Sequence, residues 1–233
     1  MAFKLALNAG HYLGTAGKRC MKSLDPNETR EWWLNNRIAD KVEERLSGYD
    51  GIELLRIDDT TGKTDRSLIK RAQLANDFGA DLYLSLHHNA GINGGDGGGI
   101  VAYVYLTPSP EALEWQKALY NELIAETGLK GNRATPLAKK NLAELRLTSS
   151  PAALLELGFM DSRSDVPAIL SEDYANKCAN AIVNVIVERA KLTKVESDKY
   201  FRVQVGAYKK RAGAETMLAK LKAAGFSGYI KED

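Results

Sequence analysis

Short apolar runs recur along the first two thirds of the chain, and each one is bounded by turn or helix signals. They predict six β-strands, at residues 3–8, 52–57, 82–86, 99–106, 142–147 and 153–159. Apolar residues at helical spacing predict four helices, at residues 28–46, 66–78, 109–127 and 174–192. This alternation favours an α/β fold, in which helices flank both faces of a mostly parallel, twisted sheet. We therefore expect one domain over residues 1–192.

The C-terminal residues follow a different pattern. Residues 193–199 are polar and lack an apolar period, so we interpret them as a linker. Strict alternation predicts a strand at residues 201–205, and a helix at 214–224, capped by Gly225, precedes a second strand at 228–231. The tail, residues 200–233, is therefore expected to form a small β-α-β unit.

Composition narrows the classes of protein that fit. A chain of 233 residues has room for one sizeable domain and a small appendage. The net charge of +2 is too even to indicate a nucleic-acid partner, and no apolar run reaches the length of a membrane span. Cys20 and Cys178 form no C-x-x-C pair, which excludes a redox motif of that kind and an all-cysteine zinc site. We expect two free thiols, and one long-range disulfide is the alternative.

All three histidines stand where predicted strands end. His11 follows the first strand, and the pair His87-His88 follows the third. Neutral imidazole binds zinc well, and a strand end holds such a ligand in place. The alternative is that each is a hydrogen-bonded structural histidine. The residues alone leave the two interpretations about equally favoured.

A catalytic zinc usually has a third protein ligand, which could be a carboxylate. The first predicted helix offers Glu28, Glu31, Glu43 and Glu44, and their spacing does not choose among them. Glu156 differs because it interrupts the apolar run at residues 152–159. A carboxylate there is costly unless it is paired, bound to a metal or catalytic. We favour a functional role over a buried ion pair with an arginine.

Two other charged sites are interpreted as structural. Arg71 lies on the second predicted helix, where we expect it to anchor a loop or a carboxylate rather than to take part in catalysis. The acidic pair Asp58-Asp59 is expected to belong to a solvated loop.

Several blocks, in order, resemble one family. Residues 10–11 carry Gly-His, residues 31–39 a helix with Glu, Asn and Ala at four-residue steps, and residues 67–81 a second helix with its turn. Residues 85–90 read Ser-Leu-His-His-Asn-Ala, and residues 145–159 end in Glu-Leu-Gly-Phe. From residue 3 to about 192 the chain resembles the zinc-dependent N-acetylmuramoyl-L-alanine amidases, the type 3 amidases.

The resemblance implies roles that spacing leaves open. Glu31 matches the zinc-binding glutamate, and His11 and His87 match the two zinc histidines. His88 should point the other way, because adjacent strand residues face opposite sides. Glu156 matches the catalytic glutamate, and Asn89 is expected to contact substrate. The sequence departs from the family at Asn8, where an aspartate is usual, and after His11, where Gly-Gly is usual.

These matches imply a peptidoglycan hydrolase with a Zn²⁺ cofactor. It would cleave the amide bond between N-acetylmuramic acid and L-alanine. Two alternatives remain: a zinc peptidase that cuts within the peptide stem of the wall, and a non-catalytic wall-binding protein with the same fold.

The tail resembles a second family. Residues 200–208, Tyr-Phe-Arg-Val-Gln-Val-Gly-Ala-Tyr, resemble the opening strand of a SPOR-type repeat, which implies binding of glycan strands. Tyr200, Phe201 and Gln204 are the expected contacts, and a small docking appendage is the alternative. One β-α-β unit of this size buries little core by itself. We therefore expect a homodimer formed through the tail.

The expected setting is lysis. The first predicted strand begins at Phe3, so we see no signal peptide and expect synthesis in the cytoplasm. The protein would reach the wall after release by a holin or by cell lysis. A phage or prophage endolysin is slightly favoured over a bacterial autolysin.

Overall fold

The computed structural model describes residues 2–195, 204–226 and 228–231. The chain divides into two compact units, residues 1–195 and residues 196–233, which are described separately.

A six-stranded sheet forms the centre of the first unit, in the order β3-β1-β4-β7-β5-β6. Its strands are β1 (Phe3–Ala9), β3 (Ile52–Arg56), β4 (Leu82–Asn89), β5 (Ile100–Val104), β6 (Leu137–Lys139) and β7 (Ala152–Phe159). The strands β3, β1, β4 and β7 are parallel, whereas β5 runs antiparallel to β7 and parallel to β6. A separate two-stranded sheet pairs β2 (Tyr49–Asp50) with β8 (Thr193–Lys194).

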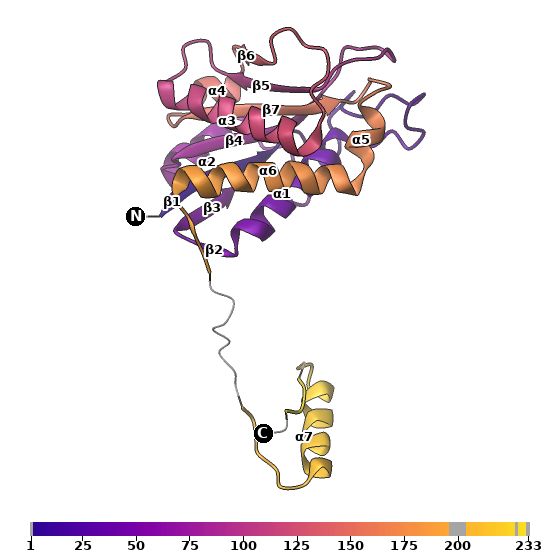
Figure 1. The fold of residues 1–233 in the computed structure, drawn as a ribbon, viewed down its shortest axis with the longest axis vertical. Helices are drawn as coiled ribbons and strands as arrows, with labels where there is room; N and C mark the ends of the chain where they lie inside the picture. Colours follow the sequence, from indigo (N-terminus) through magenta and orange to yellow (C-terminus); the bar gives the residue numbers. More distant parts are fainter. Residues whose placement is uncertain (1, 196–203, 227, 232–233) are drawn as a thin grey trace. The chain divides into compact units, whose positions relative to one another are not determined.

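Helices lie on both sides of this sheet (Figure 1). The helices α1 (Glu31–Leu46), α3 (Pro110–Thr127) and α6 (Glu172–Ala190) share one core with strand residues such as Leu5, Leu84 and Leu155. The helices α2 (Leu68–Phe78) and α4 (Ala143–Leu147) pack on the other face, against Tyr83 and Leu154 among others. A short helix, α5 (Val166–Leu170), follows β7. The predicted α/β fold is confirmed.

Local signals explain where the helices begin and end. The hydroxyl oxygens of Ser67, Ser109 and Ser171 each accept a backbone N–H in the first turn of α2, α3 and α6. Gly79 and Gly128 end α2 and α3 in the left-handed conformation that glycine adopts without strain.

Two predicted elements of the first unit were wrong. Residues 143–147 form the helix α4, with Leu142 as its N-cap, where a strand was predicted over residues 142–147. The reason is that Leu142 and Leu145, three residues apart, pack together on the core beneath it. The sixth strand of the sheet is β6, which pairs with β5, instead of the strand predicted at residues 142–147. The first helix begins at Glu31 rather than at Glu28, whose φ of 49° is left-handed and incompatible with a right-handed helix.

The predicted linker also starts later than expected. Thr193 and Lys194 form β8, and the Val195 N–H donates to the Gly48 carbonyl. These hydrogen bonds extend the first unit by three residues beyond the predicted end at residue 192.

In the second unit only the helix matches the prediction. The helix α7 spans Arg211–Ala223, but Gln204, Val205 and residues 228–231 are not in strands. The rest of the predicted first strand, residues 201–203, lies outside the described residues. No described residue of this unit is buried, so the described residues offer no buried apolar face on which strands could pair.

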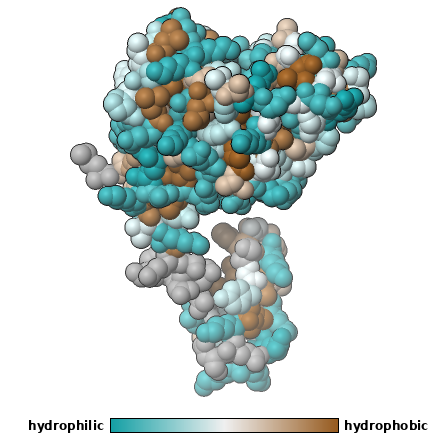
Figure 2. Space-filling model, turned by 45° about the horizontal axis from the view of Figure 1, so that its top comes forward, coloured by the Kyte–Doolittle hydropathy of each residue, from teal (hydrophilic) through white to brown (hydrophobic). Residues whose placement is uncertain are grey.

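Surface and thiols agree with the composition. On the face drawn in Figure 2, hydrophilic residues cover most of the first unit, and apolar residues gather in small patches. Cys20 and Cys178 are free, as expected, and both are buried. Among the described residues, no helix has the length and apolar character needed to cross a membrane.

Candidate active site

The predicted site residues meet at one edge of the sheet. The carboxyl ends of the parallel strands β1, β4 and β7 lie together there, where ligands bind in such folds. His11 follows β1, His87 lies near the end of β4, and Glu156 lies in β7 directly opposite His87. Glu31 is the first residue of α1. Four residues far apart in the sequence therefore converge.

His11, Glu31 and His87 form the one group of potential metal ligands among the described residues. One ligand atom from each lies within 4.8 Å of the others. Glu31 Oε1 is 3.4 Å from His11 Nε2 and 3.1 Å from His87 Nδ1. Two imidazole nitrogens and one carboxylate oxygen are a donor set that zinc binds in catalytic sites. The residues present therefore fit a zinc ion.

The buried Glu31 carries the negative charge of this group. Burial alone would favour the neutral carboxyl, but hydrogen bonds from His11 and His87 and their charges outweigh it. They hold the pKa of Glu31 well below its ordinary value, so the side chain is an ionised ligand at neutral pH.

His88 points away from the ligand group, as the alternation along the strand predicts. Its Nδ1 lies 2.8 Å from Asn35 Oδ1 on α1. Burial lowers the pKa of His88 to about 3, so the ring is neutral. Asn35 also donates to the Gly10 carbonyl at 3.1 Å, which ties α1 to the turn before His11. His88 is thus a structural histidine.

Glu144, on α4, is a residue of this site that the sequence reasoning missed. Its Oε2 lies 3.4 Å from His87 Nε2, on the side of the ring opposite Glu31. Tyr83 Oη and Asn8 Nδ2 each donate to Glu144 Oε1 at 2.9 Å. This contact is within ion-pair distance but is not a hydrogen bond; a carboxylate there favours a proton on Nε2, which would leave Nδ1 free for a metal.

The two carboxylates dominate the charge state of His87. Its burial favours the neutral ring, but Glu144 and Glu31 outweigh this and raise the pKa of His87 to about 10 in the metal-free protein. The pKa of the buried Glu144 is lowered in turn: burial opposes ionisation, and His87 and Arg71 overcome it.

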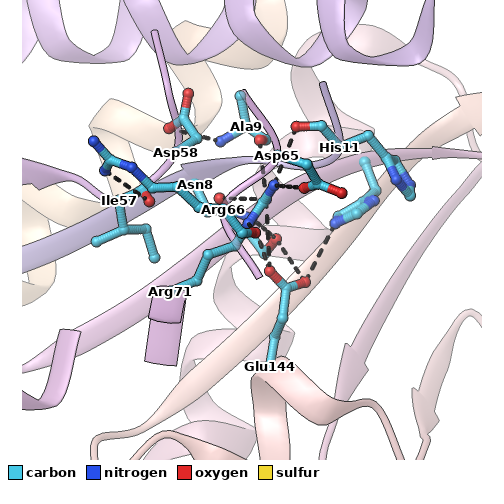
Figure 3. A network of polar contacts seen from close by, with 12 residues as sticks. Asn8, Ala9, His11, Ile57, Asp58, Asp65, Arg66, Arg71 and Glu144 are labelled. Atoms are coloured by element: carbon cyan, nitrogen blue, oxygen red, sulfur yellow. Dashed lines mark hydrogen bonds and ion pairs between the residues drawn. The ribbon is translucent and has the colours of Figure 1, made fainter. Parts of the chain in front are cut away.

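Arg71 holds the turn that carries His11 (Figure 3). Its Nη2 donates to the His11 carbonyl at 3.1 Å, and its Nη1 donates to Asn8 Oδ1 at 2.8 Å. His11 has a φ of 67°, a left-handed conformation that non-glycine residues seldom adopt. A buried guanidinium fixed on the His11 carbonyl helps to maintain it. The expected anchoring role of Arg71 agrees with these contacts.

Asp58 contradicts the expectation of a solvated loop. It is 2% exposed, accepts the Ala9 N–H at 3.2 Å, and pairs with the Arg56 guanidinium at 2.8 Å. The pairing with Arg56 offsets the cost of burying its charge. Only Asp59 lies at the surface, where it accepts N–H groups of Thr61 and Thr64.

Glu156 is the carboxyl group that lies beside the ligand group and has no ion-pair partner among the described residues. Its Oε2 is buried without a hydrogen-bond partner, and no arginine pairs with it among the described residues. Burial, reinforced by the negative charge of Glu31 and opposed by His87, raises the pKa of Glu156 to about 7. Such a group can take up and release a proton near neutral pH.

Two hollows lie next to these residues. One, of about 360 Å³, is lined by Leu13, Trp33 and residues 27–30. The other, of about 390 Å³, is lined by Asn89, Tyr103 and Arg133 together with Ala90, Gly91, Val101, Thr135 and Ala138. Asn89, an expected substrate contact, therefore lies beside the site. Of the tail contacts, Tyr200 and Phe201 lie outside the described residues, and Gln204 is exposed.

Comparisons with known proteins agree with this geometry. The profile of the N-acetylmuramoyl-L-alanine amidase family matches residues 5–188, and that of the SPOR domain matches residues 197–233. A sporulation-specific N-acetylmuramoyl-L-alanine amidase of Bacillus subtilis (strain 168) is 30% identical over 88% of this chain and 77% of its own. An endolysin of Bacillus phage SPP1 is 32% identical over 81% of this chain and 66% of its own.

The fold has solved counterparts. The crystal structure of an N-acetylmuramoyl-L-alanine amidase from Clostridium difficile 630 superposes with a TM-score of 0.73. The two share 26% sequence identity, and the match covers 82% of this chain and 97% of the other.

Proposed function

Because the chain belongs to the N-acetylmuramoyl-L-alanine amidase family, we propose that it hydrolyses the amide bond between N-acetylmuramic acid and L-alanine in peptidoglycan. The observation that supports this proposal most strongly is the strand register, in which His87 on β4 lies directly opposite Glu156 on β7. A potential metal ligand and an unpaired carboxyl of raised pKa thereby stand side by side.

His11, Glu31 and His87 would hold a zinc ion. When bound, zinc supplies Lewis acidity, which polarises an amide carbonyl and lowers the pKa of water. Glu144 would favour the tautomer of His87 that presents Nδ1, and Arg71, which donates to the His11 carbonyl, would maintain the left-handed conformation of that turn.

Glu156 would move the proton. Its carboxylate takes a proton from the attacking water, and the protonated carboxyl passes it to the nitrogen of the leaving L-alanine. In the metal-free protein burial raises the pKa of Glu156 to about 7, so neither protonation state is strongly disfavoured there at neutral pH.

The test is hydrolysis of purified wall by the wild type and by Glu156→Ala, with metal content measured for each. We expect new L-alanine amino ends from the wild type, and a variant that keeps its metal and loses activity. New amino ends within the stem would instead identify a stem peptidase. Binding without any new ends would identify a wall-binding protein.

For the tail we propose glycan binding and self-association. The SPOR profile matches residues 197–233, and Tyr200, Phe201 and Gln204 are the proposed contacts. On α7, Ala214, Met217, Leu218 and Leu221 form a half-exposed stripe at helical spacing. A second copy of the tail would cover it. The full chain should sediment as a dimer and residues 1–195 as a monomer; a monomeric full chain at high concentration would refute dimerisation.

The cellular setting stays a prediction. Similarity to a sporulation amidase and to a phage endolysin supports each of the two settings that the sequence leaves open. We propose that the protein acts on the wall after lysis of the cell or release by a holin.

A further inference from the structure

Three residues on neighbouring strands form a row across the sheet. His87 in β4 lies opposite Glu156 in β7, and Glu156 lies opposite Val101 in β5. Residues in register on adjacent strands present their side chains on the same face, about 5 Å apart. Val101 also lines the 390 Å³ hollow. The ligand group, Glu156 and this hollow therefore follow one another along one line.

The hollow contains a cation that is held in place. The Arg133 guanidinium lies 4.4 Å from the ring centroid of Phe159, which is fully buried. Among the described residues, no carboxylate lies within ion-pair distance of Arg133. Its N–H groups are therefore available to an anionic ligand, and Asn89 and Tyr103 line the same hollow.

The loop that carries Arg133 is packed closely on the glycine run before β5. A Cβ on Gly131 would lie 2.1 Å from the Gly98 carbonyl oxygen, and one on Gly99 would lie 2.5 Å from the Lys130 carbonyl oxygen. The Gly98 N–H also donates to Asn132 Oδ1 at 3.0 Å. Only glycines permit this approach, so the loop position next to the hollow is built into the sequence.

The direction of the proposed reaction indicates which part of the substrate lies in the hollow. Glu156 protonates the leaving nitrogen, so the acyl side of the scissile amide lies toward the ligand group and the peptide side lies beyond Glu156, toward Val101. One strand spacing is about 5 Å, and an extended peptide advances about 3.3 Å per residue. The residue after L-alanine therefore reaches the hollow.

Resting on the proposed function, we propose that this hollow binds the peptide stem, and that Arg133 pairs with a free carboxylate on the residue after L-alanine. The ligand class is thus an acidic peptide, and Arg133 is a specificity-determining residue. A stem in which that carboxylate is an amide would lack the charged partner.

The test compares two muramoyl tripeptides that both carry L-lysine on the γ-carboxyl of the second residue, one with D-glutamate at that residue and the other with its α-amide, D-isoglutamine. We expect the zinc-loaded wild type to show the lower KM for the glutamate substrate. Arg133→Met should raise that KM about five- to tenfold, leaving its kcat and both constants for the amide substrate within about twofold. Arg133→Lys, which keeps the charge, should retain part of the preference.

Lys130→Met is the matched control, since it removes one positive charge from the same loop at an exposed position outside the hollow. It should change neither KM. Equal effects of Arg133→Met on both substrates, or a wild type without preference, would overturn the proposal while leaving the amidase function intact. A wild type that frees no L-alanine amino group from either tripeptide or from whole wall would overturn both.

Discussion

Replacing Glu156 with glutamine separates the cost of burying its carboxylate from its chemistry, because glutamine keeps the size of the side chain and removes the ionisable group. Burial raises the pKa of Glu156 from 4.5 to about 7 in the metal-free protein. A difference of roughly 2.5 pKa units corresponds to about 3 kcal/mol. The partial exposure of the side chain makes this an upper bound.

The sign follows from which state binds the proton more tightly. The folded protein holds the Glu156 proton up to about pH 7, whereas the unfolded chain releases it near pH 4.5. The neutral carboxyl therefore stabilises the fold fully below pH 4.5, and this contribution is lost as the pH rises to about 7. Glutamine stays neutral throughout. Metal-free Glu156→Gln should match the wild type at pH 4 and exceed its unfolding free energy by up to about 3 kcal/mol at pH 8.

The assay is urea unfolding in the presence of a chelator at several pH values, followed by tryptophan fluorescence. Glu53→Gln, which removes an exposed carboxylate from β3, serves as the control and should show no gap that grows with pH. With zinc restored, Glu156→Gln should keep its metal and lose about 10²- to 10⁴-fold in kcat. If the difference in unfolding free energy between Glu156→Gln and the wild type stayed constant from pH 4 to 8, burial would not raise the pKa of Glu156, and the reasoning would be refuted.

Three further outcomes are expected. Glu144→Gln should weaken zinc binding about ten- to hundredfold in a chelator competition, because His87 Nε2 loses its carboxylate; unchanged affinity would remove Glu144 from the orienting role. Gly10→Ala should destabilise the protein by about 1–3 kcal/mol in urea unfolding, since its Cβ would lie 2.1 Å from His87 Cε1, whereas Gly48→Ala should be tolerated far better. Stripping the metal should lower the Tm, and zinc at about 100 times its Kd should restore about 2.7 kcal/mol; a Tm that is insensitive to both would argue against a metal in this site.

Hydrophobic periodicity predicts most of the fold, and the positions of the strand ends predict much of the candidate site. Strand alternation predicts that only one of His87 and His88 reaches the ligand group, and the resemblance to the amidases chose His87; the structure places Nδ1 of His88 on Asn35 instead. Glu31 is different, because four glutamates of one helix are equivalent by spacing. Only the resemblance to the amidases distinguished it, and the structure brings it to both histidines.

The missed features depend on contacts between distant segments. Asp58 looks solvated in the sequence because its partner Arg56 ends a strand and its other donor, the Ala9 N–H, lies 49 residues away. Glu144 was hidden because Leu142 and Leu145 fit a strand or one turn of helix about equally well. The burial of Glu144 on α4 is offset by hydrogen bonds from Tyr83 and Asn8, which lie on the strands β4 and β1. A local sequence pattern does not reveal hydrogen bonds from distant segments that offset the cost of burying a carboxylate.

Asn8 becomes understandable once Glu144 is placed. Its amide has two different ends: Oδ1 accepts from Arg71, and Nδ2 donates to Glu144 and to Ser85. The aspartate usual in the family would set a second buried carboxylate against Glu144, where the amide nitrogen now lies at 2.9 Å. Two like charges at that separation disfavour each other's ionisation strongly. We infer that this chain supplies the buried carboxylate between Arg71 and His87 from α4 rather than from β1, and that asparagine at position 8 is the consequence rather than a loss.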